Sequence, residues 1–155
     1  MQLNFRIFVL ALAALMLTGC ASVVNMASKE ESDKARQFNA PSAGRSGLYV
    51  YRDSPLGTDV KRDIRVDGKC LGKSAADVFF YTEVEGGRSH TIQTASEFSP
   101  NGLEVFMEAG KNYFVKQVIK MGLLYTGADL EHVNEEKGKA DVSKLNMAQP
   151  GTCSK

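Results

Sequence analysis

Hydrophobic and polar residues alternate over short distances from about residue 46 onward, and Gly, Asp, Asn or Pro separates most runs from the next. This pattern is typical of β-strands, because successive side chains point to opposite faces of a sheet and turn residues end each strand. Eight segments are predicted strands: Leu48–Arg52, Asp63–Val66, Lys69–Leu71, Val78–Val84, Ser89–Thr94, Leu103–Glu108, Asn112–Lys120 and Ala128–Val133. The sequence therefore predicts an all-β domain, a small antiparallel β-sandwich of seven or eight strands with an Ig-like architecture. Helix is expected only at Asp141–Leu145, as a short C-terminal helix or turn.

Two of these strands are predicted to form a tight hairpin around Asp67-Gly68. A two-residue type I′ turn requires positive φ at both central positions, which Asp and Gly tolerate. The expected cross-strand pairs are Val66 with Lys69, Arg65 with Cys70, and Ile64 with Leu71. In this register Cys70 points away from the core.

The segment Leu103–Glu108 predicts one buried and one solvent-facing side of a strand. Phe106 falls on the solvent-facing side, where it is the odd aromatic residue. We therefore take Phe106, together with Leu123, Leu124 and Tyr125 of a later apolar segment, as a candidate contact site for a partner protein. The alternative is that the later segment is an ordinary loop that covers the core.

The first residues have the zones of a secretory signal. Arg6 precedes an apolar run of 11 residues, Ile7–Leu17, and the small residues Thr18 and Gly19 follow. A helix that spans a bilayer needs about 20 apolar residues, so this run is too short to remain in the membrane. Residues 1–19 are predicted to be a signal peptide that is removed.

The segment Leu17-Thr18-Gly19-Cys20 resembles the bacterial lipobox at all four positions. The resemblance implies cleavage between Gly19 and Cys20 and a diacylglyceryl thioether on the Cys20 thiol. Ala21 after the cysteine, where inner-membrane lipoproteins tend to carry Asp, implies the outer membrane as the destination. The alternative is an ordinary cleavage site followed by an unmodified cysteine.

The chain after the lipobox divides into three parts. Residues 20–45 are small and polar without a sustained apolar stripe, so we expect a lipidated N-terminus and a flexible tether, with a transient helix over Ser28–Gln37 as the alternative. Residues 46–145 are the β-sandwich domain, and residues 146–155 are a C-terminal tail.

The charge balance argues against nucleic acid as a partner. The chain has 19 Lys and Arg against 18 Asp and Glu, which leaves no basic excess. Removal of Arg6 with the signal peptide makes the mature chain neutral, so we expect attachment to the membrane to depend on the lipid.

Neither histidine lies in a catalytic or metal-binding pattern. His90 shares a strand face with Ile92, and His132 with Leu130, so each is expected to be a partly buried, hydrogen-bonded sheet residue. A zinc site needs at least three converging protein ligands, whereas adjacent strand residues point to opposite faces. We expect no catalytic residues, no metal and no cofactor.

The cysteines indicate an oxidising compartment. With Cys20 assigned to the lipid, Cys70 and Cys153 remain as an even pair. Secreted proteins commonly join such pairs, so a Cys70–Cys153 disulfide is favoured, and two free thiols are the alternative.

Several motifs together are similar to a family of small bacterial envelope lipoproteins that is known as a domain of unknown function. They are Leu48–Arg52, Val66–Lys69, Glu85–His90, Ala109–Phe114 and Glu135–Lys139. The Glu-Gly-Gly turn at residues 85–87 also resembles PEGA-type β-sandwich repeats. These resemblances imply a fold and a location but no substrate.

The leading functional hypothesis is a lipid-anchored protein of the outer membrane that faces the periplasm and acts as a non-enzymatic interaction or structural module, with an envelope protein as its partner. The alternative is a lipoprotein that binds a small ligand or lipid fragment between its sheets, which requires a deep apolar pocket. An enzyme is a third hypothesis and needs reactive side chains gathered from distant strands.

Overall fold

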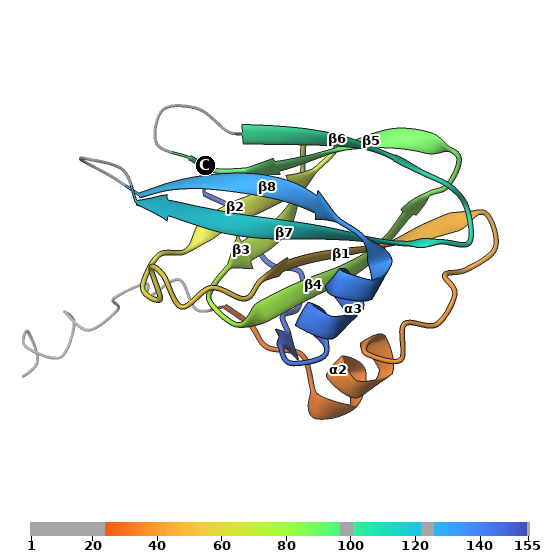
Figure 1. Ribbon diagram of the computed structural model, residues 1–155, viewed down its shortest axis with the longest axis horizontal. Coiled ribbons are helices and arrows are strands. Elements are labelled where there is room, and N and C mark those ends of the chain that lie inside the picture. Colours follow the sequence, from red (N-terminus) through yellow and green to blue (C-terminus); the bar gives the residue numbers. More distant parts are fainter. Residues whose placement is uncertain (1–23, 97–100, 122–125, 155) are drawn as a thin grey trace, which may run out of the picture.

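The computed structural model describes residues 24–96, 101–121 and 126–154. In these ranges the chain forms two β-sheets packed face to face, with two short helices on one side (Figure 1). Sheet 1 has the order β8 (Thr126–Val133), β7 (Asn112–Met121), β1 (Arg45–Arg52), β4 (Val78–Glu85), β9 (Asn146–Met147). Sheet 2 has the order β3 (Lys69–Ser74), β2 (Arg62–Val66), β5 (Arg88–Thr94), β6 (Asn101–Met107). The predicted all-β sandwich is confirmed, and all eight predicted strands are present.

Sheet 1 differs from the prediction because it is not purely antiparallel. β1 pairs with β4 in antiparallel orientation but with β7 in parallel orientation, and β4 pairs in parallel with the two-residue β9. A parallel pair joins strands that are distant in the sequence, so no local turn announces it.

Apolar side chains from both sheets fill the space between them. The buried members of this core are Leu48, Val50, Ile64, Val66, Leu71, Val78, Phe80, Val84, Ile92, Val105, Met107, Val115, Leu130 and Ala148. The strands of sheet 2 alternate as predicted, with Val105 and Met107 buried and Phe106 exposed.

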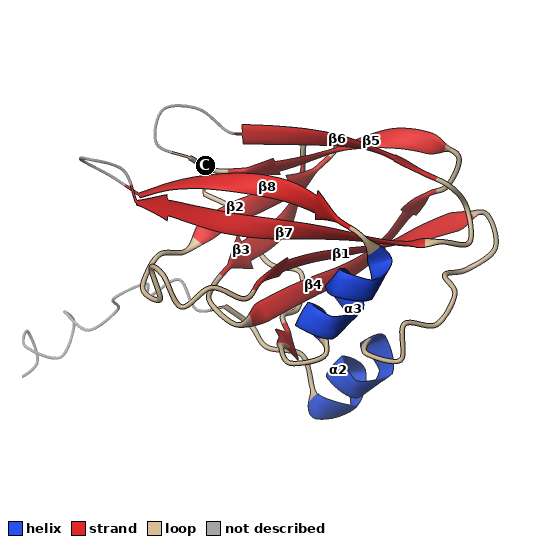
Figure 2. Cartoon of the chain, in the orientation of Figure 1, coloured by secondary structure: helices blue, strands red, loops and turns tan. Residues whose placement is uncertain are grey.

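A second apolar layer covers the outer face of sheet 1. Tyr49 and Tyr51 of β1, Phe79 of β4 and Phe114 of β7 are buried there together with Val142 of the C-terminal helix. The helices α2 (Lys29–Ala35) and α3 (Glu135–Val142) both lie on this side (Figure 2). The central strand β1 of sheet 1 is therefore buried on both faces.

α3 begins earlier than the predicted Asp141–Leu145, at the N-cap residue Asn134, whose side chain accepts a hydrogen bond from the Lys137 amide at 2.9 Å. Gly138 lies in the middle of this helix and is buried against Phe114, where a Cβ atom would come within 2.2 Å of the ring. The glycine lowers local helix propensity but allows the helix to approach β7 closely. That conflict between local preference and packing explains why the pattern predicted the helix too late.

Residues 24–45 are not the predicted flexible tether. Ser28 and Glu31 form a reciprocal capping box that starts α2. The Tyr49 hydroxyl donates to Ala35 O at 2.9 Å, and the Arg36 guanidinium donates to Leu145 O at 2.6 Å. An isolated helix of seven residues is marginal in water, so these tertiary contacts are what stabilise it.

The C-terminal segment is also part of the fold rather than a free tail. β9 extends sheet 1 beside β4, and the Met26–Ala148 bridge adds the N-terminal segment beside it. The chain then crosses to sheet 2, where the Gly151 amide donates to Leu71 O at 3.0 Å. The segment thus links the edge of one sheet to the edge of the other.

The predicted hairpin turn is confirmed, but its register holds only near the turn. Asp67 and Gly68 have φ of 49° and 76°, as a type I′ turn requires. The pairs of Val66 with Lys69 and Arg65 with Cys70 form as expected. Ile64 pairs with Gly72 rather than Leu71, because a β-bulge shifts the register between Ile64 and Arg65.

Candidate functional site

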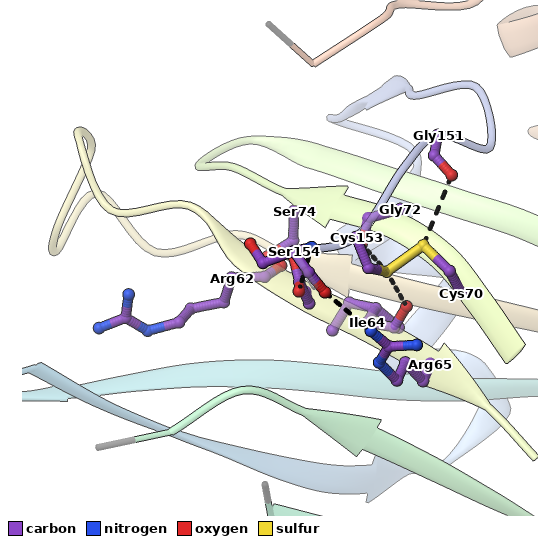
Figure 3. The surroundings of a disulfide bond; sticks show 10 residues. Arg62, Ile64, Arg65, Cys70, Gly72, Ser74, Gly151, Cys153 and Ser154 are labelled. Atoms are coloured by element: carbon purple, nitrogen blue, oxygen red, sulfur yellow. Dashed lines mark hydrogen bonds between the residues drawn. A yellow bond between two sulfur atoms is a disulfide. The ribbon is translucent and has the colours of Figure 1, made fainter. Parts of the chain in front are cut away.

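A disulfide joins Cys70 of β3 to Cys153, as the sequence predicted, with an S–S distance of 2.05 Å (Figure 3). Cys70 is exposed beside Arg65, whose guanidinium donates to Ser154 O at 3.1 Å. The Ser154 amide donates to the Asp63 carboxylate at 2.7 Å. These bonds hold the C-terminal segment along β2 and β3, so the edge of sheet 2 at this side of the sandwich is occupied.

The neighbouring edge of sheet 1 is formed by β4, and it is not covered along its whole length. The direction of the β4 main-chain groups shows which residues form this edge. The Gly47 amide donates to Lys111 O at 3.0 Å, so this residue of β1 directs its main-chain groups toward β7. Gly47 lies opposite Glu83 in the antiparallel β1–β4 register. Glu83 therefore directs its amide and carbonyl away from β1, toward the edge of the sheet. The Ala148 amide, which donates to Phe79 O at 2.8 Å, reaches β4 on that same side.

β9 covers only the start of this edge, since its two residues pair with Val78 and Phe79. Beyond β9, Tyr81, Glu83 and Glu85 direct their main-chain groups out of the sheet. In the part of the chain that the structure describes, the amides of these three residues have no hydrogen-bond acceptor. We call the segment Tyr81–Glu85 the β4 edge.

Two polar side chains lie within hydrogen-bond distance of main-chain carbonyl groups of the β4 edge. Arg45 Nη2 donates to Glu83 O at 2.6 Å, and His90 Nε2 lies 2.7 Å from Glu85 O. Polar side chains placed on a sheet edge commonly oppose uncontrolled pairing with other strands. Here they leave the edge amides accessible.

His90 is buried, with 3% of its surface exposed, and both ring nitrogens face acceptors. Nδ1 lies 2.6 Å from Asp67 Oδ2, while Nε2 faces Glu85 O. Burial raises the pKa of Asp67, but hydrogen bonds from His90 and the Thr91 amide outweigh it and hold that pKa below its usual value. The expectation that His90 is a hydrogen-bonded sheet residue is confirmed, although it is fully rather than partly buried.

A groove of about 320 Å³ lies on the outer side of the β4 edge, between α2 and sheet 1. We call it the outer groove. Its lining is Glu31, Lys34, Ala35, Asn39, Ala40, Tyr49, Tyr81, Glu83 and Met147. The aromatic rings of Tyr49 and Tyr81, with centroids 4.7 Å apart, give it a largely apolar floor.

A second groove, of about 340 Å³, lies on the inner side of the same edge, where β4 faces the hairpin of sheet 2. We call it the slit groove. Its lining is Arg45, Val66, Asp67, Lys69, Cys70, Leu71, Thr82, Glu83, Val84, Glu85, Arg88 and His90. Glu83 belongs to both grooves, so they meet at the β4 edge.

The acidic groups of the slit groove already have partners. Glu85 forms a salt bridge of 3.2 Å with Arg88, and Asp67 contacts His90. The Glu83 carboxylate accepts hydrogen bonds from the Ser42 amide and the Tyr81 hydroxyl, and the bond from Ser42 contributes most to lowering its pKa.

Two cationic side chains of the slit groove differ from Arg88 because they form no salt bridge among the described residues. Within the described ranges, neither Arg45 nor Lys69 forms a salt bridge. Lys69 is exposed at the hairpin turn, and Arg45 donates to the Glu83 carbonyl while its charge helps to lower the pKa of the Glu83 carboxylate. The charged side chains that line the slit groove, Arg45, Lys69 and Arg88 against Asp67, Glu83 and Glu85, are thus balanced in number.

The other residues singled out in the sequence are dispersed. His132 is exposed, which contradicts the expectation of partial burial, because it lies near the end of the edge strand β8, beyond the buried Leu130. Phe106 is 58% exposed on sheet 2, as predicted. Leu123, Leu124 and Tyr125 lie outside the described residues, so the proposed contact site is not tested.

Gly19 and Cys20 also lie outside the described residues. Across residues 24–96, 101–121 and 126–154, no helix is long and apolar enough to cross a membrane. The same ranges contain no group of three His, Cys, Asp or Glu side chains arranged to hold a metal ion.

Sequence analysis did not identify the β4 edge. Whether a strand lies at an edge depends on its neighbours in space, and Val78–Glu85 is as apolar at its start as a central strand. The one local signal was the cluster of charged residues near the Gly86-Gly87 turn, which is equally typical of any exposed turn.

Comparisons with known proteins identify relatives without a described function. A family model, "Protein of unknown function (DUF2846)", matches residues 42–128. A protein of Haemophilus influenzae named "Uncharacterized protein" is 53% identical over 135 residues, which cover 87% of this chain and 79% of that protein. No solved structure matches the chain significantly. The matched residues 42–128 include the β4 edge and the hairpin, but neither helix and not Cys153.

Proposed function

The chain belongs to the DUF2846 family of unknown function, and we propose that this member is a lipid-anchored protein of the outer membrane whose β-sandwich faces the periplasm and binds another envelope protein without catalysing a reaction. The observation that carries the proposal is the pairing of cysteines. The chain has 3 cysteines, and Cys70 and Cys153 form a disulfide, so Cys20 is the one left for another chemistry.

The position of Cys20 supports lipidation as that chemistry. It follows the apolar run Ile7–Leu17 and completes a segment that resembles a lipobox. A disulfide is typical of proteins that are exported to an oxidising compartment, which agrees with a signal peptide at residues 1–19.

The docking of residues 24–45 limits how far the domain extends from its anchor. Val24 packs against the core between the sheets, so only residues 21–23 separate it from the lipidated cysteine. Four residue steps span at most about 14 Å. The domain is thus held against the membrane surface rather than on a long tether.

The chemistry of the β4 edge supports binding rather than catalysis. His90 is engaged at both ring nitrogens, Glu85 is paired with Arg88, and Asp67 contacts the His90 ring. A general base needs a free position near a substrate proton, whereas these groups support the strand edge and the hairpin. The space between the sheets is filled with side chains, which gives less support to a ligand-binding pocket there.

Lipidation is tested by growing cells with an alkyne-tagged fatty acid and measuring the label on the purified chain. We expect label on the wild type and on Cys153→Ser, and none on Cys20→Ala. Label that persists in Cys20→Ala, or its absence from the wild type, contradicts the anchor.

Location is tested by separating the two membranes on a density gradient. We expect the wild type with the outer membrane and Ala21→Asp with the inner membrane. We also expect protease to digest the domain only after the outer membrane has been opened. Recovery of the wild type as a water-soluble periplasmic protein contradicts the proposed location, and digestion in intact cells contradicts the proposed orientation.

A further inference from the structure

We propose that the sandwich rests on the lipid bilayer that carries its anchor, with one defined side toward the lipid. We call this side the anchor side, and it is formed by residues 24–27, β9 and β3. The opposite side, formed by β8 and β6, is the far side and is directed away from the membrane. The proposal rests on the proposed function, because it takes Cys20 as the lipid-bearing residue.

The first described residues are fixed to the edge of sheet 1. The Ala27 amide donates to Met147 O at 2.9 Å. The Gln149 amide donates to Asn25 O at 2.8 Å. Val24 packs against the core between the sheets. The point at which the chain leaves the folded domain toward Cys20 is therefore fixed beside β9.

The remaining connection to the lipid is shorter than the sandwich is wide. Residues 21–23 separate Val24 from Cys20, so four residue steps of at most about 14 Å join them. Five strand spacings separate residues 24–27 from β8 across sheet 1, which is about 24 Å. The connection can bring the anchor side to the lipid, but it is too short to pass around the sandwich and bring the far side there.

The edges of the two sheets meet in pairs, which defines the two sides. On the anchor side, the Gly151 amide of the segment after β9 donates to Leu71 O of β3 at 3.0 Å. On the far side, the Asn101 side chain of β6 donates to Ala128 O of β8 at 2.6 Å. Figure 1 shows β6 and β8 in the upper part of the molecule and the first described residues, in orange, below them.

An exposed apolar side chain lies beside the exit point. Met26 is 46% exposed on the anchor side, where its main chain pairs with that of Ala148. Burial of its side chain among lipid headgroups removes apolar surface from water. Within the described ranges the other large exposed apolar side chains are Leu56 and Phe106. Phe106, on β6, offers more apolar surface, but the short connection keeps it from the lipid.

This orientation needs no electrostatic attraction to the membrane. Removal of Arg6 with residues 1–19 leaves 18 Lys and Arg against 18 Asp and Glu, so the mature chain is neutral. Two acyl chains are enough to hold a protein stably on a bilayer. The lipid therefore supplies the attachment, and the length of the connection supplies the orientation.

The orientation also determines how other molecules reach the two grooves. Both grooves lie along the β4 edge, and β4 adjoins β9 on the anchor side. A molecule that enters either groove therefore approaches at the level of the membrane. A soluble partner instead meets β6 and β8 first.

The first test uses the absence of tryptophan from the sequence. Met26→Trp and Phe106→Trp each introduce a single tryptophan, one on each side of the sandwich. The lipidated proteins are purified in detergent and reconstituted into vesicles of phosphatidylethanolamine and phosphatidylglycerol that contain phospholipids brominated on their acyl chains. Bromine quenches tryptophan fluorescence only at close range. We expect quenching of Met26→Trp to exceed that of Phe106→Trp at least about threefold.

Every other pattern of quenching overturns the proposal. Equal quenching of the two variants means that the domain has no fixed orientation. Stronger quenching of Phe106→Trp means that the far side faces the lipid. No quenching of either variant means that the domain stands clear of the bilayer.

A second test uses the wild type and so does not depend on how a variant folds. The vesicles contain a phospholipid with a photoreactive diazirine next to its headgroup, and mass spectrometry locates the adducts after irradiation. We expect more adducts on residues 24–30 and 146–151 than on β6 and β8. A uniform distribution, or the reverse one, overturns the proposal.

A third arrangement separates the orientation from natural lipidation. With Cys70 and Cys153 joined, Cys20 is the one thiol left in residues 20–155, which contain every described residue. This thiol is coupled to a phospholipid with maleimide on its headgroup, and the quenching of the two tryptophan variants is compared again. We expect the same difference as in the lipidated proteins.

The coupled and the native proteins together distinguish the two failures. If the native chain carries no lipid but the coupled variants keep the difference in quenching, the anchor is wrong and the orientation imposed by the short connection stands. If the native chain is lipidated but the two variants are quenched equally, the anchor stands and the orientation is wrong.

Discussion

The two sheets of the sandwich differ in how their outer faces are covered. In sheet 1 all but the first residue of β1 are buried, because the aromatic layer beneath α2 and α3 covers the face that the core does not. In sheet 2 burial alternates along β5 and β6, with Phe106 exposed on the outer face. Equivalent substitutions on the two outer faces should therefore change the free energy of unfolding by different amounts.

The difference also explains where a free strand edge is found. The helices cover the outer face of sheet 1 but not the side of β4 beyond β9, and the outer groove lies between α2 and that edge. The C-terminal segment covers the edge of sheet 2 instead.

The largest expected effect is a change in the free energy of unfolding, and one aromatic residue from each outer face is compared. Tyr49 is 1% exposed and its ring stacks on Phe114 at 4.9 Å, so Tyr49→Ala is expected to lower the free energy of unfolding by about 3–5 kcal/mol. Phe106→Ala on sheet 2 is expected to change it by less than about 0.5 kcal/mol. Urea unfolding at 25 °C under oxidising conditions measures both, and similar losses would contradict the difference between the faces.

The next effect concerns the covalent link that sheet 2 has and sheet 1 lacks. The double variant Cys70→Ser with Cys153→Ser removes a cross-link over a sequence separation of 83 and is expected to lower the free energy of unfolding by about 2–4 kcal/mol. Addition of a reductant to the wild type should reproduce the loss and should not affect the double variant. An unchanged urea midpoint would show that the bond contributes nothing to stability.

Two glycines give a matched comparison between helix-covered and uncovered backbone. Gly138→Ala places a methyl group against the Phe114 ring and is expected to lower the free energy of unfolding by about 1–3 kcal/mol, despite the better helix propensity of Ala. Gly102→Ala on β6 is expected to be neutral or slightly stabilising, because the nearest atom is 3.6 Å away. Thermal unfolding of the two variants checks the prediction, which a stabilised Gly138→Ala would refute.

A smaller effect is expected for the start of α2. Ser28→Ala removes the oxygen that accepts the Glu31 amide at 3.1 Å, which should cost about 1 kcal/mol. Hydrogen exchange should report faster opening of residues 29–35 than in the wild type, with β5 and β6 unaffected. If hydrogen exchange becomes faster to the same extent in both sheets, α2 does not open independently of the rest of the domain.

The smallest effect is a dependence on pH at the hairpin of sheet 2. The pKa of Asp67 lies below its ordinary value of 3.8 in the folded protein, so protonation favours the unfolded chain. The stabilisation is present above that value and is lost as the pH falls through the lower folded pKa. Between pH 5 and pH 2, taken as an approximate range, the wild type should lose more stability than Asp67→Asn. If the stability of the two proteins falls in parallel with pH, Asp67 is not the cause of the pH dependence.

The sequence predicted sheet 2 better than sheet 1, for a physical reason. Strands with one wet face, such as Leu103–Glu108, carry an alternating pattern, and Asp67-Gly68 specifies its turn locally. The parallel pairing of β1 with β7 and the two-residue β9 depend on residues far apart in the chain, so no local pattern predicts them.

The covering layer of sheet 1 escaped prediction for a related reason. Ser28 and Glu31 were recognisable as a cap, but a helix this short becomes stable only through Tyr49 and Leu145, which lie elsewhere in the sequence. Gly138 weakens the local signal for α3 while enabling its contact with Phe114. The candidate site was missed in the same way, because Arg45 and His90 meet at β4 only after the sheets have assembled.

The packing of Val24 against the core affects which other molecules a membrane-anchored form of this domain can reach. A lipid-bearing residue four positions earlier would confine the molecule to lateral diffusion in one leaflet, with almost no freedom to sample the space above it. Collisions would then be restricted to targets that are embedded in the same bilayer or that extend a flexible arm down to it. Lengthening residues 20–23 by a run of glycine and serine would relax that confinement without altering the folded domain.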